Sequence, residues 1–341
     1  MDYTRRDYPW LYIMTPINYI TDMLNNIDLF SGIGGFSYAM HGKVRTIAYC
    51  DISKNCRDTL KSIMDKGLID EAPLFDDIRE LTHSSFNEIP HMITAGFPCQ
   101  DISTANPGGL GLDGDRSSLF FDIVRLCEEI PTINHVFLEN VSQIQQKGML
   151  DRIYQSMENI GFSVKHIVVT AKTMGAPHTR RRCYILATKD ISELEEFRLE
   201  WGNTWENSPD TMTRIHSLSE KNIFKHRCCL CGNSVVPACV SASYNHMVHG
   251  DTIQDYSNPV NISMEDGDIS FKKPMWGTPY ASFNLYKPYK LGSVRSSGVL
   301  FNQVWYSPDN KEKRNDGWTI NPNFVEWLMG YPLDYTRNTL Q

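Results

Sequence analysis

The sequence predicts an α/β fold built on a parallel, doubly wound sheet, with a smaller and irregular second domain near the C-terminus. Two observations support the sheet. Short apolar runs alternate with segments of helical periodicity from residue 26 to about residue 188. A glycine-rich turn follows the first run, as in folds that bind a ligand beyond the carboxyl ends of their strands. The second domain is predicted because this alternation stops after residue 188.

The expected elements follow one another in a regular order. Strands are predicted at residues 26–30, 46–50, 91–95, 135–139, 164–169 and 183–187. Helices are predicted at residues 52–66, 118–130 and 149–160, and a further helical stretch ends at His249. Because strands and helices alternate at this spacing, neighbouring strands should run parallel, and the residues at their carboxyl ends should meet at one edge of the sheet.

The composition is that of an ordinary globular protein. Hydrophobic residues make up 41% and charged residues 21% of the 341 residues, which argues against wholesale disorder. No apolar run approaches the roughly 20 residues that span a bilayer, and the N-terminus has no secretion signal. We therefore expect a soluble, intracellular protein. The cysteine count of 9 is odd, which favours reduced thiols over a disulfide framework.

Charge and composition divide the chain into four parts: an N-terminal extension at 1–25, the α/β domain at 26–250, an acidic linker at 251–270 and a module at 271–341. The net charge is −7, yet the module has 9 Lys and Arg against 5 Asp and Glu, and 14 of the 38 aromatic residues. A basic, aromatic module on an acidic body is typical of a polyanion-binding site. A chance fluctuation of charge is the alternative.

The first motif is the glycine turn Asp28-Leu-Phe-Ser-Gly-Ile-Gly-Gly35, directly after the first expected strand. Glycines let the backbone turn tightly and come close to a ligand, and the following helix start offers free N–H groups. Asp51 ends the next strand about twenty residues later, where its carboxylate suits two ribose hydroxyls. Asp77 supplies a further acceptor for a base. A nucleotide-like cofactor is expected here, with a purely structural turn as the alternative.

Four further residues could carry chemistry at strand ends. Cys99 follows a proline after the third strand, and its thiolate would be a nucleophile. Glu139 ends the next strand, where a buried carboxyl group can protonate or hydrogen-bond a base ring nitrogen. Arg180 and Arg182 share one side of an extended chain and could hold carbonyl or phosphate oxygens. Taken singly, each has a structural alternative: a buried thiol, a helix cap and a solvated basic turn.

Together, and in this order, the motifs resemble those of the cytosine-C5 DNA methyltransferases, which use S-adenosyl-L-methionine. The resemblance covers about residues 26–188 and the element Gly232-Asn-Ser-Val235. Its most specific part is the pair Phe97-Pro-Cys-Gln100 and Glu139-Asn-Val141, with forty residues from Cys99 to Glu139. Segments 109–120 and 148–162 are also similar to the family. Residues 232–235 precede the basic module, an order that looks like that of phage and large-DNA-virus members.

The resemblance implies a Rossmann-like methyltransferase sheet and a reaction at a cytosine base. Cys99 would add to C6 of the cytosine, and Glu139 would hold N3 and the exocyclic amine. Arg182 would contact O2, with Arg180 near a phosphate or in the same loop. The base would have to flip out of duplex DNA to reach this site.

The resemblance also implies a cofactor site and a DNA-recognition region, and requires no metal. The cofactor would be held by Phe30, Gly32, Gly34, Asp51, Asp77, Pro98, Asn233 and Ser234. The module at 271–341 would recognise double-stranded DNA, and its candidate phosphate contacts are Lys272, Lys273, Lys287, Lys290 and Arg295. Ordinary solvated surface is the alternative for each of these five. No membrane partner is expected, and a paired restriction endonuclease is not indicated by the sequence.

Two features qualify this interpretation. His178 stands where the family usually has Gln; since histidine can still hydrogen-bond, we expect altered tuning and not inactivity. Cys228 and Cys231 have the spacing of half a zinc site, but a second ligand pair at a convincing spacing is missing from the sequence, so packed thiols are expected.

Three other functions remain open. A tRNA cytosine-C5 methyltransferase would use the same catalytic domain, although the additional basic module favours DNA. A DNA-binding member without turnover is disfavoured because the nucleophile, the acid and the arginine pair are all present. A small-molecule oxidoreductase would leave residues 97–100 and 139–141 unexplained.

Overall fold

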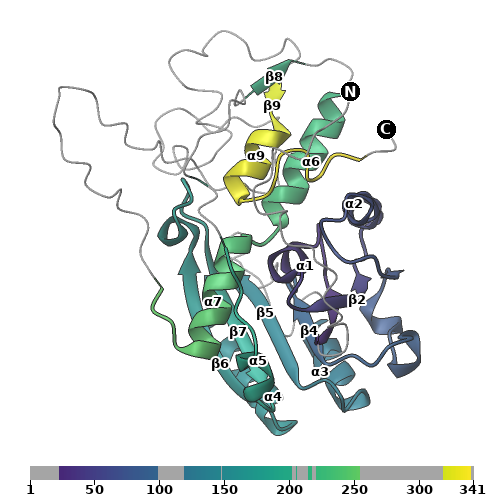
Figure 1. Cartoon of the computed structure of the whole chain (residues 1–341), viewed down its shortest axis with the longest axis vertical. Helices are drawn as coiled ribbons and strands as arrows, with labels where there is room; N and C mark the ends of the chain where they lie inside the picture. The colour runs from purple at the N-terminus through teal and green to yellow at the C-terminus, as the bar shows by residue number, and fades with distance from the viewer. Residues whose placement is uncertain are drawn as a thin grey trace, which may run out of the picture.

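The computed structural model describes residues 23–98, 119–146, 148–201, 205, 214–216, 220–253 and 318–338. Its centre is a seven-stranded sheet in the order β3-β2-β1-β4-β5-β7-β6 (Figure 1). The strands are β1 Asn25–Leu29, β2 Arg45–Cys50, β3 Leu74–Phe75, β4 Met92–Ala95, β5 His135–Val141, β6 Ser163–Thr170 and β7 Arg181–Thr188. All six predicted strands are present, and the short β3 is additional.

Helices cover both faces of the sheet, as the doubly wound prediction requires (Figure 1). One face packs against α1 Gly35–Met40, α2 Lys54–Asp65 and α7 Pro237–His249, and the other against α3 Leu119–Glu129 and α4 Met149–Asn159. Successive residues of a strand point to opposite faces. In β5, the fully buried Phe137 joins the core with α1, and the fully buried Leu138 joins the core with α3 and α4.

The prediction of a wholly parallel sheet is wrong at one strand. β1 to β5 pair in parallel, but β7 is antiparallel to both β5 and β6. Only residues 171–180 join β6 to β7, and they contain one turn of 3₁₀ helix, Ala171–Met174. A parallel connection needs a crossover of a dozen or more residues, so this short link returns the chain in the opposite direction.

The sequence after β7 is more ordered than its composition indicates. A short α5 Ser192–Glu195 is followed by α6 Lys221–Asn233, which was not predicted, and by α7 at the expected place. In α6 even Arg227 is buried, together with Phe224 and Cys228. Because this helix buries residues on several sides, its sequence lacks the one-sided apolar stripe that identifies a surface helix.

The described end of the predicted C-terminal module, residues 318–338, packs against the α/β body. β9 Trp318–Ile320 pairs with β8 Arg214–His216, and α9 Pro322–Met329 packs beside α6 (Figure 1). Tyr331 and Tyr335 lie in the same buried cluster as α1 and α7. Residues 1–22 and 254–317 lie outside the described residues, and with them most of the expected extension, the linker and the five candidate phosphate contacts.

In the part of the chain that the structure describes, no helix is both long and apolar enough to span a bilayer.

Candidate active site

The glycine turn lies at the carboxyl end of β1. Phe30, Gly32 and Gly34 have positive φ angles of 51°, 56° and 73°, a region that favours glycine. The Gly32 N–H donates to Asp51 Oδ2 at 2.8 Å, and Asp51 Oδ1 accepts from the Ser53 N–H at 2.8 Å. The Asp51 carboxylate therefore ties the turn after β1 to the end of β2.

Beneath the turn lies a buried acid that sequence reasoning did not assign to the site. Asp28 is 1% exposed, and its carboxylate accepts from Ser37 Oγ at 2.9 Å and Thr94 Oγ1 at 3.0 Å. Burial raises the pKa of Asp28 to about 7, although these hydrogen bonds act in the opposite direction. The one sequence signal was its position: an acidic residue inside an apolar strand directly before the glycines.

The chain after β2 and after β3 contributes one apolar and one acidic side chain. Asp77 lies at the start of a 3₁₀ turn, and Arg79 Nε donates to its Oδ1 at 2.9 Å, which lowers the pKa of Asp77. Ile52, next to Asp51, is an apolar side chain with 74% of its surface exposed. Sequence reasoning missed Ile52, because its exposure cannot be read from an isoleucine at the end of an apolar run.

The end of β4 leads towards the predicted nucleophile. The Phe97 carbonyl accepts from Asn140 Nδ2 at 3.2 Å, which fastens the end of β4 to the end of β5. Pro98, predicted to line the cofactor site, is half-buried at this point. Cys99 lies outside the described residues, so its geometry stays a prediction. Its two preceding neighbours nevertheless fix where the chain leaves β4.

Glu139 and Arg182 form an ion pair at the ends of β5 and β7. Arg182 Nε lies 2.9 Å from Glu139 Oε1, and the side chains are 20% and 10% exposed for Arg182 and Glu139. A Cβ atom added to Gly96 would lie 3.7 Å from Glu139 Oε2, so the carboxylate stands beside the chain that leads to Cys99. The structure thus brings together the predicted acid, the second arginine and the approach to the predicted nucleophile.

Arg180 is buried against the junction of α6 and α7. Its guanidinium donates to the Gly232 carbonyl at 2.8 Å and the Ser234 carbonyl at 2.7 Å, and the residue is 4% exposed. Burial lowers the pKa of Arg180 to about 10, which still leaves it charged at neutral pH. Because both bonds go to the junction of α6 and α7, Arg180 anchors this junction to the segment before β7.

His178 is buried with Arg180. Its Nδ1 accepts from the Arg180 N–H at 3.3 Å, and the side chain is fully buried. Burial, together with the neighbouring positive charge of Arg180, lowers the pKa of His178 to about 3. At neutral pH the imidazole is therefore uncharged, and it takes part in positioning the backbone of the Arg180 segment.

The two residues predicted to close the cofactor site from 232–235 have separate environments. Asn233 ends α6 and is exposed. Ser234 is buried, with its Oγ hydrogen-bonded to the Tyr331 hydroxyl. A Cβ atom at Gly35 would collide with Tyr331 and Val235, so α1 packs closely against this junction. Ser234 thus packs against the start of α1, which is the helix that follows the glycine turn.

Among the described residues, none of the cysteines forms a disulfide. Cys228 and Cys231 are buried, and burial raises the pKa of both. Within the described ranges, no group of three or more His, Cys, Asp or Glu side chains could hold a metal ion.

Comparison with known proteins identifies the relatives of this chain. Residues 24–338 match the family model of the C-5 cytosine-specific DNA methylases. The chain is 33% identical to the Type II methyltransferase M.CviJI of Paramecium bursaria Chlorella virus IL3A, over 92% of this chain and 98% of the viral protein. It is 31% identical to the Type II methyltransferase M1.ScrFI of Lactococcus lactis subsp. cremoris, over 51% of this chain and 44% of that protein.

The solved structures that match part of this chain include two DNMT2 proteins. A Spodoptera frugiperda DNMT2 variant matches 49% of this chain and 50% of its own, with a TM-score of 0.41 and 20% identity. The S. pombe Dnmt2 methyltransferase matches 60% of this chain and 67% of its own, with a TM-score of 0.42 and 19% identity.

Proposed function

Since the chain belongs to the C-5 cytosine-specific DNA methylases and is a DNA (cytosine-5-)-methyltransferase, we propose that it methylates C5 of a cytosine flipped out of duplex DNA, through a covalent bond between Cys99 and C6. One arrangement carries this proposal: the Glu139–Arg182 ion pair stands beside Gly96, three residues before Cys99. A carboxylate and a guanidinium at that point can bind the polar edge of the base that the thiolate attacks.

The residues of the glycine turn fit an adenosyl cofactor. Asp51 uses each carboxylate oxygen for one backbone N–H, and a carboxylate has about four acceptor sites, so two ribose hydroxyls can still bind. A Cβ atom at Gly32 would meet nothing within 4 Å, which leaves the turn open to a ligand. The exposed Ile52 offers an apolar contact for a flat base beside Asp51.

We assign the cofactor to S-adenosyl-L-methionine, which supplies the methyl group. Its proposed contacts are Phe30, Gly32, Gly34, Asp51, Ile52, Asp77 and Pro98. Asp77 would accept from the base while Arg79 keeps its carboxylate ionised. Ser234 would act indirectly, through the packing of α1, whereas Asn233 stays a candidate for direct contact because it is exposed.

The chemistry requires that C5 of the aromatic ring become nucleophilic. The Cys99 thiolate forms a bond to C6, and the electron pair of the C5–C6 double bond becomes available at C5. Glu139 holds N3 and the exocyclic amine as charge develops on the ring, and Arg182 holds O2. C5 would then accept the methyl group, with the thioether S-adenosylhomocysteine as the leaving group. Transfer of the C5 proton to a base restores the double bond and releases the Cys99 thiolate. None of these atoms can be reached inside a base stack, so the base must flip.

We place DNA recognition in the part of the chain between α7 and β9, residues 254–317. This part retains Lys272, Lys273, Lys287, Lys290 and Arg295, the candidate phosphate contacts. The relatives are named Type II methyltransferases, so methylation within a restriction–modification system is the setting we propose.

Transfer of tritiated methyl groups from S-adenosylmethionine tests the function. Unmethylated duplex DNA and total tRNA would be offered to the wild type, to Cys99→Ser and to Cys229→Ser, a control at a half-buried thiol on α6. We expect 5-methylcytosine in DNA with the wild type and the control, and none with Cys99→Ser. Incorporation into tRNA alone would move the substrate to RNA. No incorporation into either nucleic acid, with the cofactor still bound, would indicate a DNA-binding protein without turnover.

A further inference from the structure

Residues 331–338, which we name the C-terminal strap, reach the glycine turn from the opposite end of the sequence. The Tyr335 hydroxyl donates to the Ile33 carbonyl at 2.9 Å, and Tyr335 is fully buried. Ile33 lies between Gly32 and Gly34, both of which have positive φ angles. A residue near the C-terminus therefore holds the middle of the turn that the proposed function assigns to the cofactor.

The ring of Tyr335 is fixed by its neighbours. It stacks on Tyr331 with a centroid distance of 4.6 Å and meets the edge of Tyr38, in α1, at 5.2 Å. The Tyr331 hydroxyl donates to the Val235 carbonyl at 2.9 Å, next to the close contact at Gly35. Because the rings are packed independently of the hydroxyl groups, removing the Tyr335 oxygen alone should leave the packing in place.

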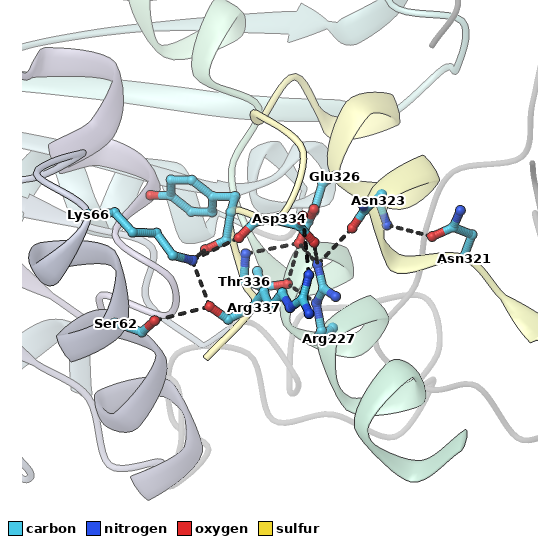
Figure 2. A network of polar contacts seen from close by, with 10 residues as sticks. Ser62, Lys66, Arg227, Asn321, Asn323, Glu326, Asp334, Thr336 and Arg337 are labelled. Atoms are coloured by element: carbon cyan, nitrogen blue, oxygen red, sulfur yellow. Dashed lines mark hydrogen bonds and ion pairs between the residues drawn. The ribbon is translucent and has the colours of Figure 1, made fainter. Parts of the chain in front are cut away.

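The backbone of the strap is fastened to α2 (Figure 2). Lys66 Nζ donates to the carbonyls of Asp334, Tyr335 and Arg337 at 2.8, 3.0 and 2.6 Å. Ser62 Oγ donates to the Arg337 carbonyl at 3.0 Å. Four donor bonds, one from Ser62 in α2 and three from Lys66 directly after it, thus hold the strap beside this helix.

A buried ion pair fastens the strap to α6 and α9 as well (Figure 2). Arg227 Nη2 lies 2.8 Å from Glu326 Oε1, which also accepts from the Thr336 N–H at 2.9 Å. Arg227 Nε donates to Thr336 Oγ1 at 3.1 Å. Glu326 is fully buried, and Arg227 is 6% exposed. The strap is therefore held on both sides of Tyr335, which makes the hydroxyl a rigid support for the turn.

The turn needs such a support. Phe30 adopts a positive φ of 51°, which is an unfavourable conformation for a residue with a side chain, and it persists only where its surroundings impose it. The Ile33 carbonyl is the point at which the strap acts on this turn. Without that donor, the turn would more readily adopt other conformations, and the fraction competent to bind ligand would fall.

We propose that Tyr335 is a positioning residue of the cofactor turn, so that the C-terminal strap sets the affinity for the adenosyl cofactor without taking part in methyl transfer. This rests on the proposed function, since it presumes that the turn binds S-adenosylmethionine. It also assigns a role to the chain end that the sequence placed in the DNA-recognition module.

Isothermal titration of S-adenosylhomocysteine into the full-length protein tests this inference. Wild type would be compared with Tyr335→Phe and with Tyr154→Phe, a matched loss of a hydroxyl on α4 that bonds His166 Nδ1 at 2.7 Å. We expect the Kd to rise roughly 3- to 10-fold in Tyr335→Phe, the effect of one hydrogen bond, and to stay unchanged in Tyr154→Phe. The KM for S-adenosylmethionine should rise by the same factor, with kcat and the KM for DNA unchanged.

A second variant protects the test against misfolding. Lys66→Met removes three bonds to the strap and should also raise the Kd for S-adenosylhomocysteine. An unchanged Kd in Tyr335→Phe would overturn the positioning role, as would a fall in kcat together with a rise in both KM values, which indicates general loosening. If the wild type itself does not bind S-adenosylhomocysteine, the cofactor assignment of the proposed function fails first, and this inference fails with it.

Discussion

The two halves of the site are held in different ways. The cofactor half, at the ends of β1 to β3, depends on side-chain bonds made beyond the paired strands, such as Asp51 with Gly32 and Tyr335 with Ile33. The base half depends on the sheet itself. Glu139 and Arg182 extend from adjacent antiparallel strands, where Val141 pairs with Arg182, and their ion pair crosses between those strands.

Because the two halves are held differently, cofactor affinity and the rate of methyl transfer should respond to different substitutions. Alterations of the base half should change the rate of methyl transfer and leave cofactor affinity intact. Alterations of the cofactor half should change affinity first. Arg180 connects the halves, because it lies directly before β7 and bonds the α6–α7 junction that packs against α1.

The largest expected effect is in the base half. Glu139→Gln keeps the shape of the side chain but removes the charge that pairs with Arg182. We expect kcat to fall about 10²- to 10⁴-fold, the range for loss of a positioned acid–base group. The Kd for S-adenosylhomocysteine, measured by titration, should stay within about twofold. A large loss of cofactor affinity would show that the halves are not separable.

The next effect concerns the acid beneath the turn. The pKa of Asp28 is raised to about 7 in the folded protein, so this carboxyl binds its proton more tightly folded than unfolded. Below pH ~4 the protonated carboxyl therefore makes its full contribution to the free energy of unfolding, up to about 4 kcal/mol. This contribution is lost as the pH rises to ~7. Urea unfolding at several pH values should show this decline in the wild type. Asp28→Asn should lack it, and equal pH dependence in both would exclude Asp28 as the cause.

Loss of the connecting arginine should affect both halves. Arg180→Met leaves two buried carbonyls, Gly232 and Ser234, without their donor. We expect the free energy of unfolding to fall by about 2–4 kcal/mol, measured by urea denaturation. Arg181→Met changes the exposed neighbour and should cost less than about 0.5 kcal/mol. Equal effects of the two substitutions would contradict the anchoring role.

The last of these effects is in the cofactor half. Asp51→Asn removes the charge that accepts from Gly32 and Ser53 and that we assign to the ribose. The Kd for S-adenosylhomocysteine should rise about 10- to 100-fold, as for the loss of a charge-assisted hydrogen bond. At saturating cofactor, kcat should recover to near the wild-type value. A kcat that stays low at saturation would place Asp51 in the chemical step.

Much of the fold could be predicted, because local patterns determine it. The apolar runs became strands within about two residues, and the polar residues at their ends meet at one edge of the sheet. The direction of β7 could not be read from its own residues, since it follows from the shortness of the 171–180 link. The glycine turn and Glu139 were identifiable because their residue types and order are specific.

The remaining features depend on contacts across long stretches of sequence. Nothing near Tyr335 indicates that its hydroxyl bonds Ile33, and a tyrosine in a basic, aromatic segment is equally typical of a nucleic-acid surface. Arg180 and Arg182 look equivalent in an extended chain, yet one bonds a helix junction and the other pairs with Glu139. The different roles of the two arginines could not be predicted, because Arg180 bonds the end of α6, a helix whose sequence has no one-sided apolar stripe.

The central claim is that the base half brings a cytosine to Cys99, and trapping tests it most directly. Duplex DNA containing 5-fluorocytosine has no C5 proton to lose, so an adduct at C6 cannot release the enzyme after methyl transfer. With S-adenosylmethionine, the wild type should form a complex that survives denaturing electrophoresis, and peptide mapping should find the base on Cys99. Glu139→Gln should form it much more slowly. The claim would be contradicted by a stable complex with Cys99→Ser, or by an active wild type that forms none.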